Sequence, residues 1–146
     1  MEKVLRHRKS AKSFIAARQQ HLLEVAEDYV ELIADLIQSK GKARICDIAA
    51  HFGVSHVTVV RAVQRLQRKG YLHAQPHKPI TLTKIGEQLA TFSKSRHHLL
   101  LKYLISIGVP EEVAAVDVEG MEHHISIQTL EVFRNQLDKL AKKGLS

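Results

Sequence analysis

The stretch that decides the fold is residues 43–70, which read ARICDIAAHFGVSHVTVVRAVQRLQRKG. Its apolar residues recur at helical spacing in two blocks, and the blocks meet at Gly53, a residue suited to a tight turn. We expect one helix over about residues 44–51 and a second that begins after the N-terminal cap Ser55 and ends at Gly70. The stretch therefore predicts a helix-turn-helix, and the positions expected to pack its two helices together are Ile45, Ile48, Phe52, Val54, Val59, Ala62 and Leu66.

With those positions directed inward, one face of the second helix points outward. In DNA-binding helix-turn-helix proteins, residues near the start of this helix reach base edges in the major groove. Arg61 is the best candidate for a forked contact with a base or a phosphate. We interpret the face as a DNA-binding surface, and the alternative is a pair of helices with a solvated basic face. The outward residues are Ser55, His56, Thr58, Val60, Arg61, Gln64 and Arg65.

A short hairpin is expected directly after the helix-turn-helix. Residues 71–83 read YLHAQPHKPITLT, in which β-branched and aromatic residues are interrupted by Pro76 and Pro79. Such a hairpin would be the wing of a winged helix-turn-helix, and Lys78 at its tip suits a contact with the DNA backbone. The wing favours DNA binding over the alternative of a solvated basic face.

Helix patterns account for most of the remaining chain. Apolar residues recur over about residues 16–38 and predict one long amphipathic helix that stops at Gly41. Thr83 can cap a second long helix that reaches about residue 107. Two more helices are expected over about residues 110–124 and 126–140. The predicted fold class is therefore mainly α, with three parts: a basic N-terminal extension (1–20), a winged helix-turn-helix domain (21–83) and a helical lobe (84–146).

The charges of this 146-residue chain are unevenly distributed. The formal net charge is +7 at pH 7, and the bases gather in residues 1–20 and 40–78, which suits an anionic partner such as DNA. The acids gather instead in residues 24–35 and 111–122. A basic protein with two concentrated acidic segments suggests that a cation lies between them.

The rest of the composition points to the cytoplasm. The single Cys46 can form no internal disulfide, and we expect it to be a small core residue of the helix-turn-helix. No stretch reaches the roughly 18 consecutive apolar residues that a membrane span requires. The basic N-terminus also lacks the apolar core of a secretion signal. We therefore expect a cytoplasmic protein without a membrane partner.

The densest group of potential metal ligands is the segment 118–124, VEGMEHH. Glu119, Glu122 and His123 stand at positions i, i+3 and i+4, so we expect them to project from one helix face. Carboxylates and imidazoles without a thiolate suit manganese or another hard to borderline divalent ion. The first and middle helices add further donors of the same kind, namely Asp28, Glu31 and His97.

These residues alone leave other interpretations open. An acid pair at i and i+3 is usually a solvated helix face, and a metal-independent winged-helix regulator would use the acids in ordinary ion pairs. A carboxylate-bridged metalloenzyme could use the same ligands, but it would leave the basic helix and the wing without a purpose. We therefore expect a protein that is not an enzyme and that has no organic small-molecule substrate.

Residues 27–133 resemble the diphtheria toxin repressor family, and within it the manganese transport regulators. The resemblance rests on EDYVE at 27–31, the winged helix-turn-helix, Arg96-His97, IGV at 107–109 and DVEGMEHH at 117–124. Iron-responsive relatives have a cysteine, or a methionine in its place, where this chain has Glu119, so the resemblance implies manganese rather than iron. It further implies a paired metal site whose ligands are Asp28, Glu31, His97, Glu119, Glu122 and His123.

The resemblance also implies partners and a regulatory role. It implies that the helical lobe is a metal-binding and dimerisation lobe, that two copies form a two-fold homodimer, and that the dimer binds a palindromic double-stranded operator to repress manganese uptake genes. The expected cofactor is Mn2+, as many as two ions per subunit, with Fe2+, Co2+, Cd2+ or Zn2+ as substitutes. Residues 1–20 extend beyond the group's core, and we expect no ligands from the SH3-like domain of the larger iron regulators.

Overall fold

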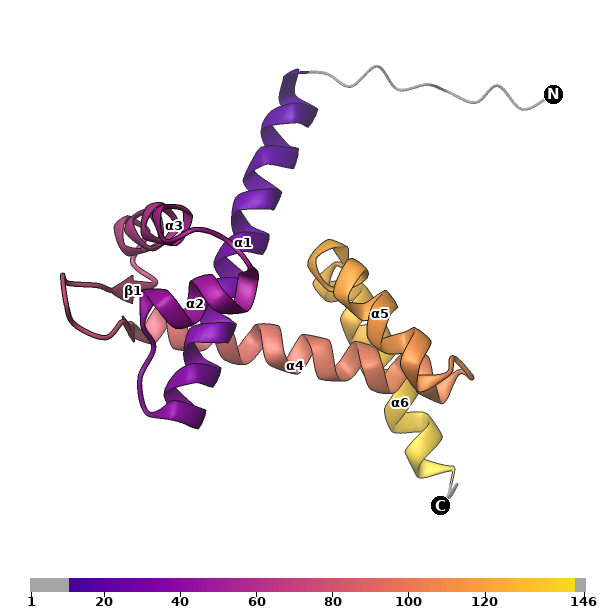
Figure 1. The fold of residues 1–146 in the computed structure, drawn as a ribbon. Helices are drawn as coiled ribbons and strands as arrows, with labels where there is room; N and C mark the ends of the chain where they lie inside the picture. The colour runs from indigo at the N-terminus through magenta and orange to yellow at the C-terminus, as the bar shows by residue number, and fades with distance from the viewer. Residues whose placement is uncertain (1–10, 144–146) are drawn as a thin grey trace.

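The computed structural model describes residues 11–143 and consists almost entirely of helices, which form two lobes joined by one long helix (Figure 1). The first lobe contains the helices before residue 70 and a small hairpin, and the second lobe contains the last helices of the described chain. The elements in order are α1 (Ala11–Lys40), α2 (Ile45–Phe52), α3 (His56–Arg68), β1 (Leu72–His73), β2 (Thr81–Leu82), α4 (Lys84–Ser106), α5 (Glu111–Met121), the 3-10 helix η1 (Glu122–His124) and α6 (Ile127–Lys142).

The helix-turn-helix predicted from residues 43–70 is confirmed as α2 and α3. Gly53 lies between them in the left-handed conformation, with φ 65°, and its N–H donates to the carbonyl of Ala49. The Ser55 hydroxyl caps α3 by accepting a hydrogen bond from the Thr58 N–H at 3.2 Å. A glycine turn and a hydroxyl cap thus place two short helices in the arrangement that the sequence indicated.

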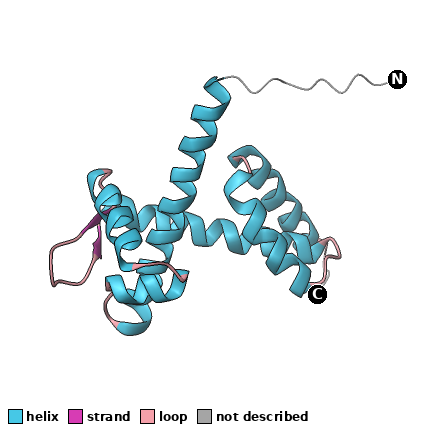
Figure 2. Ribbon diagram, turned by 45° about the horizontal axis from the view of Figure 1, so that its top comes forward, coloured by secondary structure: helices cyan, strands magenta, loops and turns pink. Residues whose placement is uncertain are grey.

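The predicted wing is also confirmed. Strands β1 and β2 pair antiparallel, with Leu72 opposite Leu82, and they form the small hairpin at the outer end of the first lobe (Figure 2). An isolated bridge between Ala43 and Ile80 adds a hydrogen bond of 2.8 Å from the Ile80 N–H to the Ala43 carbonyl. This bridge ties the second arm of the hairpin to the chain just before α2, so wing and helix-turn-helix form one unit.

Two separate hydrophobic cores hold the lobes. The first core joins α1, α2, α3 and the base of the hairpin, and its fully buried side chains include Ile33, Ile48 and Leu66. The second core is small and joins α4, α5 and α6 through Leu100, Val118 and Leu130. Burying one such side chain fully contributes roughly 1.5–3 kcal/mol to the free energy of unfolding, relative to leaving it exposed. Because α1 packs against α4, the two cores are connected by a helix pair rather than merged.

Several sequence predictions were wrong in detail. Cys46 is exposed rather than buried in the core, and Val54 is exposed in the turn. The helix expected over 110–124 ends as regular α-helix at Met121 and tightens into η1. Helix α1 begins at Ala11, about five residues before its expected start, and residues 1–10 of the basic extension lie outside the described chain. No helix within residues 11–143 has both the length and the apolar character needed to cross a membrane.

The junction between the wing and α4 is held by a close backbone approach at Gly86. Thr83 caps α4 by accepting from the Gly86 N–H at 3.1 Å, and its own hydroxyl donates to the Gly70 carbonyl at 2.6 Å. A Cβ built on Gly86 would collide with the backbone carbonyl oxygen of Tyr71. Only glycine therefore lets the first turn of α4 lie against the start of the hairpin.

We predict that Gly86→Ala lowers the free energy of unfolding by about 1–3 kcal/mol, because the added methyl group forces the backbone apart. The measurement is urea unfolding of the metal-free protein at a fixed protein concentration. Gln88→Ala, an exposed change in the same helical turn, is the matched control and should stay within about 0.5 kcal/mol of the parent. Equal stability of Gly86→Ala and the parent would contradict the close approach.

Candidate metal centre

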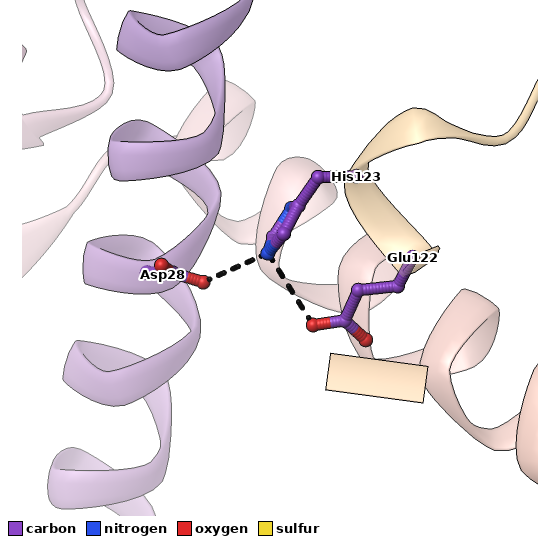
Figure 3. A group of neighbouring side chains, drawn as sticks. All are labelled: Asp28, Glu122 and His123. Atoms are coloured by element: carbon purple, nitrogen blue, oxygen red, sulfur yellow. Dashed lines mark ion pairs between the residues drawn. The ribbon is translucent and has the colours of Figure 1, made fainter. Parts of the chain in front are cut away.

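Three potential ligands from two distant parts of the chain meet between the lobes (Figure 3). Asp28 lies on α1, while Glu122 and His123 lie on η1, and one ligand atom from each falls within 4.8 Å of the other two. The His123 Nε2 atom lies 3.3 Å from an Asp28 carboxylate oxygen and 3.4 Å from a Glu122 carboxylate oxygen. The fold thus brings together residues that are about ninety positions apart.

A pocket of about 320 Å³ lies beside this group. In it, His97 on α4 forms a 2.7 Å hydrogen bond through Nδ1 with Glu122, and a Glu119 carboxylate oxygen lies 4.0 Å from the same nitrogen. Five of the six predicted ligands line this pocket, and the sixth, His123, contacts Asp28 and Glu122 directly. The lining residues that bear carboxylates or imidazoles are Asp28, Glu31, Asp35, His51, His97, Glu119 and Glu122.

Burial and mutual repulsion disfavour the charged form of the carboxylates in this group, and a bound cation would offset both effects. Glu122 is only 4% exposed, and its burial raises the pKa of its carboxyl, against the opposing hydrogen bond from His97. The pKa of Asp28 is also raised, first by desolvation and then by the nearby carboxylates of Glu31 and Glu27, while His123 opposes the shift. Clustered, partly desolvated carboxylates repel one another unless a positive charge compensates them.

Glu119 and Glu122 reach the same side of the pocket but differ in exposure. Carboxylate oxygens of the two residues lie 4.0 and 2.7 Å from the same His97 Nδ1 atom. Glu122, in η1, is buried, while the Glu119 side chain remains 71% exposed at the rim of the pocket. Both side chains still border the same pocket.

The sequence interpretation missed the residues that orient the ligands. Glu27 is buried beside Arg96 in an ion pair, and the same Glu27 carboxylate lies 2.8 Å from the Nδ1 atom of His123. When Nδ1 donates to Glu27, the Nε2 atom of His123 is left free to face Asp28 and Glu122, which is how metal-ligating histidines are commonly oriented. The only signal in the sequence was adjacency, since Glu27 precedes Asp28 and Arg96 precedes His97.

Glu31 is oriented in a similar way. The hydroxyl of the fully buried Ser93 on α4 donates to the Glu31 carboxylate at 3.0 Å. The same two helices are joined at the surface by an ion pair between Lys94 and Asp35, also 3.0 Å. These contacts fix the side of the pocket that α1 and α4 share.

The donor set fits a hard or borderline divalent cation. It contains carboxylate oxygens and imidazole nitrogens, and the exposed Cys46 lies instead in the groove between α3 and the wing. Manganese, magnesium and similar ions favour oxygen donors, whereas copper(I) and structural zinc favour thiolates. The residues that are present therefore fit a divalent metal of the manganese type.

The predicted DNA-binding residues lie together on the face of α3 and on the wing. Ser55, His56, Thr58, Val60, Arg61 and Gln64 are exposed, as is Lys78 at the wing tip, while Arg65 is half-buried. Between α3 and the wing runs a groove of about 970 Å³. Three further basic residues line this groove, and all three belong to the basic segment 40–78 that the sequence assigned to an anionic partner, namely Arg44, Arg68 and His77.

A second pocket connects the metal centre with the DNA-binding helix. Its volume is about 390 Å³, and Asp28 and Tyr29 of α1 line it together with Arg61 and Arg65 of α3. A candidate metal ligand and two cationic residues of the DNA-binding face thus border the same space.

A winged helix-turn-helix joined to an acid-lined metal pocket defines the class of metal-dependent DNA-binding regulators. Comparison with protein families gives the same result for both lobes. Residues 21–80 match the iron dependent repressor N-terminal DNA binding domain, and residues 83–143 match the iron dependent repressor metal binding and dimerisation domain. The chain belongs to the iron dependent repressor family, which confirms the family resemblance seen in the sequence.

Individual relatives agree with this assignment. The transcriptional regulator MntR of Escherichia coli O6:H1 is 45% identical over 121 residues, which cover 83% of this chain and 78% of the relative. The HTH-type transcriptional regulator MntR of Bacillus subtilis (strain 168) is 40% identical over 105 residues, which cover 72% of this chain and 74% of the relative.

Solved structures share the fold. A manganese-dependent transcriptional repressor in complex with manganese superimposes with a TM-score of 0.68 at 26% identity, over 77% of this chain and 52% of that one. The IdeR protein of T. acidophilum gives a TM-score of 0.63 at 24% identity, over 77% and 53%. The chain spans about half the length of these two structures.

We predict that manganese binding weakens as the pH falls, and that it releases protons. The raised pKa values of Asp28 and Glu122 mean that protons compete with the metal at a higher pH than ordinary carboxylates would allow. The measurement is calorimetric titration of manganese into metal-free protein in buffers of different ionisation enthalpy.

Glu122→Gln should release fewer protons for each ion bound, since one ionisable carboxyl is removed. Proton release equal to the parent would exclude Glu122 as a titrating ligand. The raised pKa values also affect the stability of the metal-free protein. Above the folded-state pKa values of Asp28 and Glu122, the two charged carboxylates lower the free energy of unfolding. This loss disappears once the pH falls below the pKa values that the same groups have in the unfolded chain. Metal-free protein should therefore not lose stability from these two groups on mild acidification.

Proposed function

We propose that this protein is a manganese(II)-responsive transcriptional repressor that binds operator DNA as a homodimer in the cytoplasm and controls manganese uptake genes. The observation that carries the proposal is the convergence of Asp28, Glu122 and His123 beside a pocket lined by His97 and Glu119. The MntR relatives and the fold shared with a manganese-dependent repressor support the choice of metal.

The metal centre would act by fixing the orientation of the two lobes. Asp28 and Glu31 belong to α1, which packs in the DNA-binding lobe, whereas Glu122 and His123 belong to the second lobe. Without a cation the carboxylates repel one another and leave the lobe orientation loose. A bound divalent ion would supply a positive charge that attracts the carboxylates of both lobes and so fixes the orientation of the lobes. The two DNA-binding lobes of a dimer could then bind the two half-sites of an operator at the same time.

The ligand arrangement supports a paired site with as many as two ions per subunit. Asp28 and Glu122 belong both to the group with His123 and to the pocket with His97 and Glu119, so each carboxylate can serve two neighbouring positions. Oxygen donors dominate both positions, which favours manganese and leaves Fe2+, Co2+, Cd2+ or Zn2+ as substitutes when they are abundant. Glu119 in particular adds a carboxylate where a softer sulfur ligand would favour other ions.

DNA recognition would use α3 and the wing. The residues near the start of α3 would contact base edges in the major groove, and Lys78 would contact the backbone from the wing. The basic groove between them adds Arg44 and Arg68 as candidate phosphate contacts. Enzymatic activity is not favoured, because the two matched domains are a DNA-binding domain and a metal-binding and dimerisation domain.

We predict that His97→Ala abolishes the manganese-dependent gain in operator affinity, because it removes an imidazole from the pocket without touching α3. The measurement is fluorescence anisotropy of labelled operator DNA, titrated with protein in the presence of manganese or of a chelator. Weak, salt-sensitive DNA binding should survive. His98→Ala is the control, since His98 is the exposed neighbour that does not line the pocket. A normal response of His97→Ala to manganese would exclude it as a ligand.

We also predict that Arg65→Gln increases the manganese affinity of the free protein about twofold to tenfold, since a unit charge near a divalent ion costs on the order of 1 kcal/mol in partly hydrated surroundings. The reason is that Arg65 and Asp28 line the same pocket. Calorimetry without DNA measures the effect, and Arg65→Lys, which keeps the charge, should behave as the parent. Equal affinity of all three proteins would rule out electrostatic communication across this pocket.

A further inference from the structure

The N-terminal end of α1 is a helical segment that the rest of the described chain leaves exposed. Every residue from 11 to 19 is exposed, and two large apolar side chains are among them: Phe14 is 55% exposed and Ile15 is 48% exposed. In Figure 1 this part of α1 projects away from both lobes.

The exposed apolar side chains continue the face of α1 that is buried further along. Phe14 lies eleven residues before Val25, and Ile15 lies eleven residues before the buried Ala26; eleven residues are close to three full turns. The face that packs into the protein's own core after Val25 is therefore uncovered in the segment 11–19. Lys12 and Arg18 add positive charge to this segment.

Helix α5 exposes a matching surface in the second lobe. Val113 is 48% exposed and Val116 is 72% exposed, and Gly120 follows on the same face with open space where a side chain would be. Two acidic residues, Glu112 and Asp117, lie on either side of this stripe. The buried residues Ala114 and Val118 are on the opposite face of α5, so the stripe plays no part in the core of its own lobe.

We propose that the segment 11–19 of α1 in one copy packs against the Val113–Val116–Gly120 stripe of α5 in a second copy. Both surfaces are apolar and narrow, and their charges are opposite: Lys12 and Arg18 would face Glu112 and Asp117. The stripe lies inside the metal binding and dimerisation domain, residues 83–143, so this contact would extend the interface that the family already uses.

Other pairings of the same surfaces are electrostatically worse. Two α5 stripes facing each other would oppose acids with acids, and two α1 segments would oppose bases with bases. Only the crossed pairing joins unlike charges, and in a two-fold dimer it occurs twice. A close approach is feasible at Gly120, where nothing lies within 4 Å of the position of a Cβ.

The direction of the segment is set by contacts at its inner end. The Gln20 side-chain amide donates to the backbone carbonyl of His123 at 2.5 Å, and Glu24 lies 3.0 Å from the ring nitrogen of His124. These contacts attach α1 to η1 within about one and a half turns of the end of the exposed segment. The proposed contact between copies is therefore carried by the same helix that carries Asp28.

Sedimentation analysis of the full chain tests the proposal. The double variant Phe14→Glu, Ile15→Glu should raise the dimer dissociation constant at least tenfold, whereas Ala16→Glu, which places an acidic side chain on the opposite face of the same segment, should leave it close to the parent value. Circular dichroism confirms that the variants remain helical. An unchanged dissociation constant in the double variant would overturn the proposal, and so would loss of operator affinity without loss of dimerisation, which would mean that the segment faces DNA.

A charge exchange and a crosslink identify the partner surface. Lys12→Glu with Arg18→Glu should weaken dimerisation, and adding Glu112→Lys with Asp117→Lys should restore it. In a Cys46→Ser background, a Phe14→Cys chain mixed with a Val116→Cys chain should form a disulfide-linked dimer, while an Ala16→Cys chain should not. Failure of the rescue, or equal crosslinking from positions 14 and 16, would contradict the contact. None of these readouts depends on manganese, so the result is separable from that of the proposed function.

Discussion

The arrangement of the whole molecule depends on one buried ion pair, Glu27 with Arg96. Both side chains are almost fully removed from solvent, and they join α1 of the first lobe to α4. Removing one partner of such a pair typically costs about 3–5 kcal/mol, because the other charge is left buried and unpaired. Since Glu27 also holds the ring of His123, the pair that joins the helices also sets the orientation of a candidate ligand. The metal centre is therefore built on an electrostatic contact that exists before any metal binds.

Local sequence signals predicted most of the fold. Gly53, Ser55 and Thr83 mark the turn and the two helix caps through contacts with their immediate neighbours, so their roles could be read from the sequence. The position of Cys46 could not, because the crossing angle of α2 and α3 decides which side of a short helix is covered. The partnership of Glu27 with Arg96 spans 69 positions, and nothing in the local pattern of either residue indicates the other.

The candidate ligands also combine features that the local sequence predicts with features that depend on distant contacts. Their spacing indicated that Glu119, Glu122 and His123 are neighbours. In the structure Glu119 and Glu122 line the same pocket, and Glu122 and His123 belong to the same group of potential ligands. Spacing could not indicate that the helix tightens after Met121, or that Glu122 is buried while the Glu119 side chain stays exposed, because burial depends on contacts with distant parts of the chain. Two carboxylates with the same chemistry thus have different solvation, and the buried one has the stronger need for a cation.

Helix α4 is a single uninterrupted rod that runs from the wing to the second lobe (Figure 1). His97 lies thirteen residues from its first residue, Lys84, a length of about 20 Å at the helical rise. A rotation of roughly 10° at His97 would displace the far end by about 3 Å, which is close to the separation of successive base pairs. Because α4 is continuous, a small change of ligand geometry at His97 would be carried, enlarged, to the end of the helix that adjoins the wing.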